Sequence, residues 1–215
     1  MSAPTPTYYL FRYPADLIDV WTLPDGTRVT LRPVLPQDQP LIADFLKGLS
    51  RAARQQRFRG VGAFSASQLA QMSQIDYRYH LAFVATIKEH EAETIVADAR
   101  YVVDDHEHAC ADFALVVDDH WQRRGIGTRA VQALSEVAHR RGLRWLRGEV
   151  GNDNPAMLAF AQQRGFLRTR HPDDDTLLRI EKPLVSPRGG KRGKGGKSAG
   201  SQRGGWLARL LPQSA

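Results

Sequence analysis

An apolar segment followed by a polar, glycine-containing turn is the feature that most restricts how this chain can fold. Residues 111–127 read ADFALVVDDHWQRRGIG, and Thr128–Arg141 then repeats apolar residues at helical spacing. The N–H groups in the first turn of a helix have no partner within the helix, and glycines let a ligand approach the backbone closely. The segment therefore predicts a strand, a turn that binds an anionic group such as phosphate, and a helix.

The spacing of this turn, Gln122-x-x-Gly125-x-Gly127, separates it from the two commonest nucleotide-binding loops. It lacks the Gly-Lys-Ser/Thr ending of the nucleoside triphosphatase loop and the third glycine of the dinucleotide fingerprint. Taken alone, such a turn is also compatible with a simple glycine-rich entry into a buried helix. The positive charges of Arg123, Arg124 and Arg129 favour the anion-binding interpretation.

The remaining patterns predict a mixed α+β domain. Alternating apolar residues indicate strands at Arg28–Arg32, His80–Lys88, Thr94–Val103, Ala109–Val117, Leu143–Val150, Phe166–Arg170 and Thr176–Lys182. Apolar residues three and four positions apart indicate helices at Pro36–Leu49, Ser50–Phe58, Ser67–Ile75, Thr128–Arg141 and Pro155–Arg164. An antiparallel meander comes before the alternating helices and strands, which excludes a doubly wound sheet. We therefore expect a mainly antiparallel central sheet flanked by helices.

The length of 215 residues and the hydrophobic fraction of 42% suit one globular domain with tails. We expect an irregular N-terminal arm over residues 1–25, the domain over 26–185, and a disordered, basic, Gly/Ser-rich tail over 186–215. Seven of the 30 basic residues lie in that tail, which contains no acidic residue, so the rest of the chain carries 23 residues of each sign. The net charge of +7 predicts at most weak contact with nucleic acid or an acidic surface, through the tail.

Cysteine usage and hydropathy indicate a cytoplasmic protein without membrane insertion. Cys110 is the only cysteine, which excludes an internal disulfide framework and a thiolate zinc cluster. No apolar run reaches the ~20 residues of a membrane-spanning helix, and the first residues lack the pattern of a secretory signal. The acidic and histidine residues of 104–108 could be imagined as a metal site, but a solvated turn is the favoured interpretation, and we expect no metal.

Three stretches, ADFALVV, WQRRGIGTRAVQAL and GEVGNDNPAMLAFAQQRGF, together resemble the GNAT superfamily of coenzyme A-dependent N-acyltransferases. The upstream stretch DGTRVTLRPVLPQDQPLIADFLKGLSRAARQQRF is similar to the acetyltransferase module of bacterial protein-lysine acetyltransferases. The resemblance covers about Trp21 to Leu184. It implies a sheet with one splayed pair of strands, acetyl-CoA as the donor, and an amine acceptor, most simply a protein lysine, attacked directly in a ternary complex.

The resemblance also implies roles for individual residues. The backbone of Leu115, Val116 and Val117 would pair with the pantetheine arm as if it were another strand. The pyrophosphate would be held by the segment Gln122, Arg123, Arg124, Gly125, Ile126, Gly127 and Thr128. Asn154 would contact the cofactor where the two strands splay, although an asparagine before Pro155 is equally well explained as a helix cap.

Asp112 is the first candidate for a catalytic base. A lysine amine of pKa ~10.4 is mostly protonated at neutral pH, so a positioned base helps to remove a proton. Related lysine acetyltransferases carry a glutamate where this chain has Asp112, whose carboxylate is withdrawn by one methylene. A solvated aspartate at a sheet edge is the alternative interpretation, and Glu149 on the neighbouring strand is the second candidate.

Two further features depart from the family or leave its function open. The tyrosine that many relatives use as a general acid has no counterpart, since all six tyrosines precede Asp104; a thiol of pKa ~8.5 can leave as a thiolate without one. The basic cluster of Arg51, Arg54, Arg57 and Arg59 is either a solvated helix face or a surface for acidic proteins. A small-molecule amine acceptor, or a coenzyme A-binding module without effective catalysis, remain the alternative functions.

Overall fold

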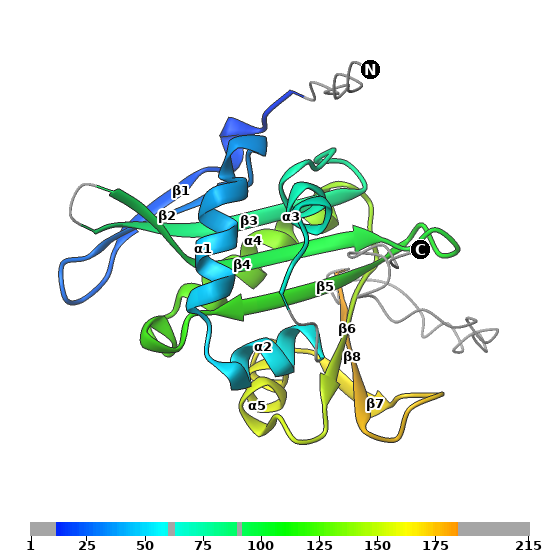
Figure 1. Cartoon of the computed structure of the whole chain (residues 1–215). Helices are drawn as coiled ribbons and strands as arrows, with labels where there is room; N and C mark the ends of the chain where they lie inside the picture. The colour runs from blue at the N-terminus through cyan, green and yellow to red at the C-terminus, as the bar shows by residue number, and fades with distance from the viewer. Residues whose placement is uncertain (1–11, 60–62, 90–91, 185–215) are drawn as a thin grey trace, which may run out of the picture.

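The computed structural model describes residues 12–59, 63–89 and 92–184. They form one eight-stranded sheet in the order β1-β2-β3-β4-β5-β6-β8-β7 (Figure 1). The β5–β6 pair is parallel and the other neighbouring strands are antiparallel, which confirms the expected mixed, mainly antiparallel α+β fold. The strands are β1 (Asp19–Thr22), β2 (Arg28–Pro33), β3 (His80–Glu89), β4 (Ala92–Val103), β5 (Cys110–Val117), β6 (Trp145–Gly151), β7 (Leu167–Arg170) and β8 (Leu177–Pro183).

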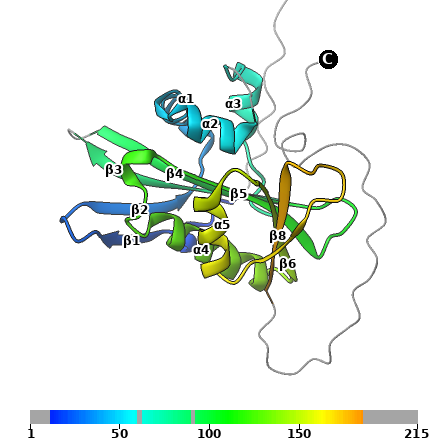
Figure 2. The same cartoon turned by 90° about the horizontal axis from the view of Figure 1, so that it is seen from below.

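Helices cover both faces of the sheet, which buries its central strands. In Figure 2, α1, α2 and α3 lie on one face and α4 and α5 on the other. The helices are α1 (Gln39–Gly48), α2 (Arg51–Phe58), α3 (Ala66–Ser73), α4 (Ile126–Arg140) and α5 (Pro155–Gln163), with short 3₁₀ turns η1 (Ala15–Leu17), η2 (Pro36–Asp38) and η3 (Asp119–Trp121). Because both faces are covered, β3 is buried almost throughout, from Leu81 to Ile87.

Local sequence signals account for the ends of several helices. Ser50 caps α2, since its hydroxyl accepts a hydrogen bond from the Ala53 N–H at 3.1 Å. Ser65 and Gln68 form a reciprocal capping box at the start of α3. Gly142 and Gly165 follow α4 and α5 with φ of +84°, a conformation that favours glycine. These caps agree with the predicted helices, apart from shifts of a few residues at the boundaries.

The prediction of an irregular arm over residues 1–25 is wrong for Asp19–Thr22, which form β1. This strand pairs antiparallel with β2, with Asp19 opposite Leu31 and Thr22 opposite Arg28. Four residues are too few for a clear alternation, and β1 is largely exposed at the sheet edge, so its sequence carries little pattern. Residues 1–11 and the predicted tail at 186–215 lie outside the described residues.

The pairing of β5 with β6 ends early and opens a gap in the sheet. Their register runs from Cys110 opposite Trp145 to Asp112 opposite Arg147, although both strands continue. The ring of Phe113 lies at the point of separation, directly over the backbone of Gly148. A Cβ added at Gly148 would lie 2.8 Å from Cε1 of Phe113. A glycine at this position therefore lets the ring pack where the two strands part. The separation itself confirms the splayed pair of strands that the resemblance implied.

Candidate functional site

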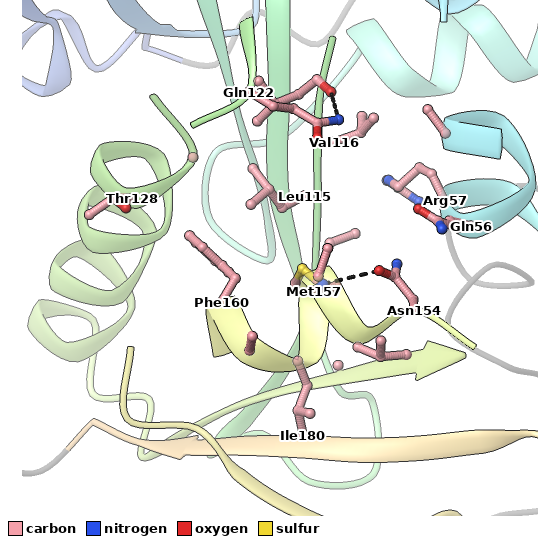
Figure 3. Close-up of a pocket in the computed structure, with 18 of the residues that line it drawn as sticks. Gln56, Arg57, Leu115, Val116, Gln122, Thr128, Asn154, Met157, Phe160 and Ile180 are labelled. Carbon is pink, nitrogen blue, oxygen red and sulfur yellow. Dashed lines mark hydrogen bonds between the residues drawn. The ribbon is translucent and has the colours of Figure 1, made fainter. Parts of the chain in front are cut away.

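A cavity of about 710 Å³ occupies the gap between β5 and β6. Its lining comes from both faces of the sheet: Gln56 and Arg57 belong to α2, whereas Thr128 and Phe160 belong to α4 and α5 (Figure 3). Residues 113–117 of β5 line it along their length. The cavity therefore passes through the sheet, so that two molecules can approach each other from opposite faces.

The beginning of α4 forms one end of the cavity. Arg123 and Gly125 adopt left-handed backbone conformations, with φ of 60° and 85°, and turn the chain into the helix. The first hydrogen bond of the helix runs from the Arg129 N–H to the Gly125 oxygen at 3.1 Å, and no side chain among the described residues caps this end of α4. The N–H groups of the first turn are therefore free to bind an anion, with the positive end of the helix dipole behind them.

Gly127 brings this helix end close to β5. A Cβ at this position would lie 3.2 Å from Cδ2 of Leu115 and 3.3 Å from Cγ2 of Val117. A larger residue would therefore require the helix end or these two side chains to shift by a few tenths of an ångström. The short distance places the anion-binding turn beside the strand edge that β6 leaves unpaired, so a single elongated ligand can contact both.

The structure places most of the predicted cofactor-binding residues at the cavity. Nine of them line it: Leu115, Val116, Val117, Gln122, Arg123, Gly125, Gly127, Thr128 and Asn154. The side chain of Gln122 donates hydrogen bonds to the Val117 oxygen at 3.1 Å and to Asp119 Oδ1 at 3.3 Å. Gln122 thus ties the turn to the end of β5, a role that the sequence did not indicate.

Two of the predicted residues direct their side chains elsewhere. The side chain of Ile126 is 1% exposed and packs in the core, which leaves only its backbone for a ligand. The guanidinium of Arg124 stacks over the Trp121 ring, 4.7 Å from its centroid, and forms an ion pair with Asp25. Arg123, which lines the cavity, is thus the better placed of the two adjacent arginines to add charge there.

Asn154 was predicted either to contact the cofactor or to cap a helix, and its position in the structure is compatible with both. Its Oδ1 accepts a hydrogen bond from the Met157 N–H at 3.0 Å, so it caps α5 (Figure 3). It also lines the cavity. The cap occupies the amide oxygen and leaves the amide nitrogen as the donor that a ligand can use.

The two candidate bases occupy different places. Glu149 lines the cavity, on the strand that diverges from β5. Asp112 is the last residue of β5 paired with β6, opposite Arg147, and is absent from the residues that line the cavity in the described part of the chain. Asp112 and Arg147 are paired and share a face of the sheet. Glu149 follows Arg147 by two positions on β6, so its side chain lies on the same face, farther along the part of β6 that has separated from β5.

Sequence reasoning missed Arg57 and His171. Arg57 belongs to the basic cluster predicted as either a solvated helix face or a surface for acidic proteins, but it is only 5% exposed and lines the cavity from α2. The pKa of Arg57 is lowered to about 9, chiefly by burial; Asp98 opposes this shift and Arg100 adds to it, and the guanidinium stays charged at neutral pH. Its spacing of four residues from the buried Ala53 could have placed it on the inner face of α2. No pattern marked His171, which hydrogen bonds Glu149.

Other candidate features lie outside the cavity. The Asp104 carboxylate accepts hydrogen bonds from the N–H groups of His106 and Glu107, as expected of a turn. The described residues contain no group of acidic, histidine and cysteine side chains that could hold a metal ion. Burial raises the pKa of Cys110 to about 12, so its thiol is inert at neutral pH. None of the helices among the described residues has the length and apolar character needed to span a membrane.

Comparisons with known proteins agree with this geometry. Residues 51–166 match the model of the acetyltransferase (GNAT) family. Acetyltransferase PA5475 of Pseudomonas aeruginosa is 33% identical over 163 residues, which cover 74% of this chain and 87% of that protein. Acetyltransferase Pat of Mycolicibacterium smegmatis is 30% identical over 155 residues, 72% of this chain but only 46% of that protein.

A solved structure shares the fold. The crystal structure of the GNAT domain of S. lividans PAT superposes with a TM-score of 0.72, covering 80% of this chain and 99% of that domain at 22% identity. At this identity the likeness concerns the fold alone. It shows the same mixed sheet with flanking helices that the described residues form.

Proposed function

This chain belongs to the acetyltransferase (GNAT) family and is therefore an N-acyltransferase, and we propose that it transfers the acetyl group of acetyl-CoA to lysine side chains of proteins. The observation that carries the proposal is the cavity that passes through the sheet between β5 and β6. Donor and acceptor can enter it from opposite faces. Proximity within such a site supplies a large part of the acceleration of a two-substrate reaction.

The residues of the cavity fit coenzyme A. The uncapped first turn of α4 and the side chain of Arg123 suit a pyrophosphate. The edge of β5 beyond Asp112, unpaired with β6, suits the amide groups of a pantetheine arm. Gly127 holds these two parts together, because a Cβ there would crowd Leu115 and Val117. Bound acetyl-CoA supplies the acetyl thioester.

Glu149 is the residue that we assign as the base. Its carboxylate, at the cavity wall, accepts a proton from the acceptor ammonium, which leaves a neutral amine able to attack. A backbone N–H of β5 near Leu115 donates a hydrogen bond to the carbonyl oxygen on which charge develops. Arg57, which lines the cavity from α2, adds a fixed positive charge that disfavours the protonated form of a nearby amine.

The protein-lysine acceptor is supported by the resemblance in the sequence and by the likeness to Pat proteins. The match to Pat spans less than half of that protein, so the properties of its remaining part do not transfer to this chain. We place the acceptor on the α2 side of the cavity, where Gln56 and Arg57 form part of the lining, across the sheet from α4 (Figure 2).

Incubation of the purified chain and labelled acetyl-CoA with a lysate of its host tests the acceptor. Glu149→Gln serves as the matched control, because it keeps the size of the side chain and removes its basicity. We expect label on discrete proteins, on lysine side chains, from the wild type and at least about 100-fold less from Glu149→Gln. Label confined to small molecules would contradict the protein acceptor. Equal background labelling by both chains would contradict catalysis and favour a binding module.

A further inference from the structure

Glu149 has a hydrogen-bonded partner that is not one of the residues lining the cavity. His171 Nε2 lies 3.1 Å from Glu149 Oε1, and the two side chains are 12% and 16% exposed. His171 follows β7 and does not line the cavity. Among the described residues, its contact occupies Oε1 and leaves Oε2 as the oxygen that can face an acceptor amine.

The backbone fixes which ring nitrogen of His171 carries hydrogen. The N–H of Asp173 donates to Nδ1 at 3.2 Å, so Nδ1 acts as an acceptor. In a neutral imidazole the hydrogen then resides on Nε2, which donates to Glu149. The hydrogen bond from the ring therefore holds the carboxylate in one orientation.

The turn that contains His171 has its own internal hydrogen bonds and is tied to two other elements. Asn152, next to the end of β6, donates from its N–H to the Thr176 oxygen at 2.9 Å. Asp174 accepts hydrogen bonds from the backbone and hydroxyl of Thr176, at 2.9 and 2.6 Å. Arg59, at the end of α2, lies 3.7 Å from Asp174. These contacts hold the turn, and with it the imidazole, at a fixed position relative to β6 and α2.

We propose that His171 is a positioning residue that orients Glu149 toward the acceptor amine, an inference that rests on the proposed acetyltransferase function. The imidazole takes no proton from substrate in this arrangement. It occupies Oε1 and so restricts the rotamers of a carboxylate that lines the cavity. Arg179, opposite Glu149 on β8, shares this face of the sheet, and its Nε makes no hydrogen bond among the described residues, so His171 supplies the directional contact.

Steady-state acetyl transfer by three variants of the full chain tests this role. His171→Leu removes the donor, whereas His171→Gln retains an amide N–H near the position of Nε2. His106→Leu is the control, since His106 is exposed in the turn before β5. We expect His171→Leu to lower kcat by about 10- to 100-fold with the KM for acetyl-CoA unchanged, and His171→Gln to recover most of that loss.

A double-mutant cycle separates positioning from a general structural effect. In the Glu149→Gln background, His171→Leu should change kcat by less than about 2-fold, because the carboxylate through which His171 acts has already been removed. The positioning role would be overturned if His171→Leu lowered kcat equally in the Glu149→Gln background, or if His171→Leu alone left the kcat of an active enzyme unchanged. Either result would leave the proposed acetyltransferase function standing. A wild-type chain without any acetyl transfer would overturn the proposed function itself, and this inference with it.

Discussion

Two carboxylates on one face of the sheet differ in their access to the cavity. Glu149 lines the cavity, whereas Asp112 lies where β5 and β6 are still paired. We expect Glu149→Gln to lower kcat/KM for the acceptor by about 100-fold or more, and Asp112→Asn to have a smaller effect, because a base must reach the proton that it removes. Initial rates of coenzyme A release with both variants check this prediction. A larger loss in Asp112→Asn would return the role to that residue.

Gly127 lets the first turn of α4 approach β5. Gly127→Ala introduces a Cβ within 3.2–3.3 Å of Leu115 and Val117, so the helix end and these side chains, which line the cavity, can no longer keep their present positions. We expect the Kd for acetyl-CoA, measured by calorimetry, to rise about 10-fold or more while the protein stays folded. Gly48→Ala is the matched control, since a Cβ there meets nothing within 4 Å. Equal affinities in the two variants would contradict the close approach.

The role of a single residue could be predicted from the sequence where that role depends on its neighbours in the chain, and not where it depends on a distant segment. The turn around Gly125 is encoded by neighbours in the chain, and the structure places most of its residues at the cavity. His171 reaches Glu149 across 22 positions, through strand pairing that no local pattern records. Asp112 followed from a resemblance, which fixes its position on β5 but not how far the β5–β6 pairing extends.

At the level of elements, the gap between β5 and β6 depends on Phe113 and Gly148. In Gly148→Ala the new methyl group would lie 2.8 Å from Cε1 of Phe113 and 3.3 Å from Cγ1 of Ile180. Such overpacking costs about 1–3 kcal/mol of unfolding free energy, which urea denaturation can measure. Combining it with Phe113→Leu should cost less than the sum of the two single changes. Additive losses would show that the ring does not press on Gly148.

The elements themselves were largely predictable. Helices with a cap and an apolar stripe, such as α4, and strands that alternate or are continuously apolar were recognised with errors of a few residues at their ends. β1 was missed because a short, exposed edge strand has no buried face to impose a pattern. The resemblance, rather than any periodicity, indicated the splayed strands, and the structure adds the contact that separates them.

Several charged side chains are buried together in the molecule, beneath α2 and α3. Asp98 forms an ion pair with Arg100, whose guanidinium also donates to the Met72 oxygen at 3.2 Å. His80 lies beside this pair, and its Nε2 is buried without a hydrogen-bond partner among the described residues. The pKa of His80 is lowered to about 3, chiefly by burial and also by Arg100, while Asp76 and Asp98 oppose the shift.

This network predicts how stability depends on pH. The unfolded chain binds a proton on His80 near pH 6.5, whereas the folded protein does not until about pH 3, so acidification through this interval favours unfolding. Between pH 6.5 and 5 we expect the unfolding free energy to fall by up to about 1.4 kcal/mol per pH unit more in the wild type than in His80→Leu. Parallel denaturation series would detect it, and identical slopes would refute a neutral buried His80.

A crystal structure of the chain with acetyl-CoA tests the central claim most directly. We predict the pyrophosphate at the N-terminal turn of α4, the pantetheine arm along residues 113–117 of β5, and the thioester in the gap beside Glu149. Acetyl-CoA bound elsewhere, or seated in the cavity with its thioester turned away from Glu149, would contradict this account of the site.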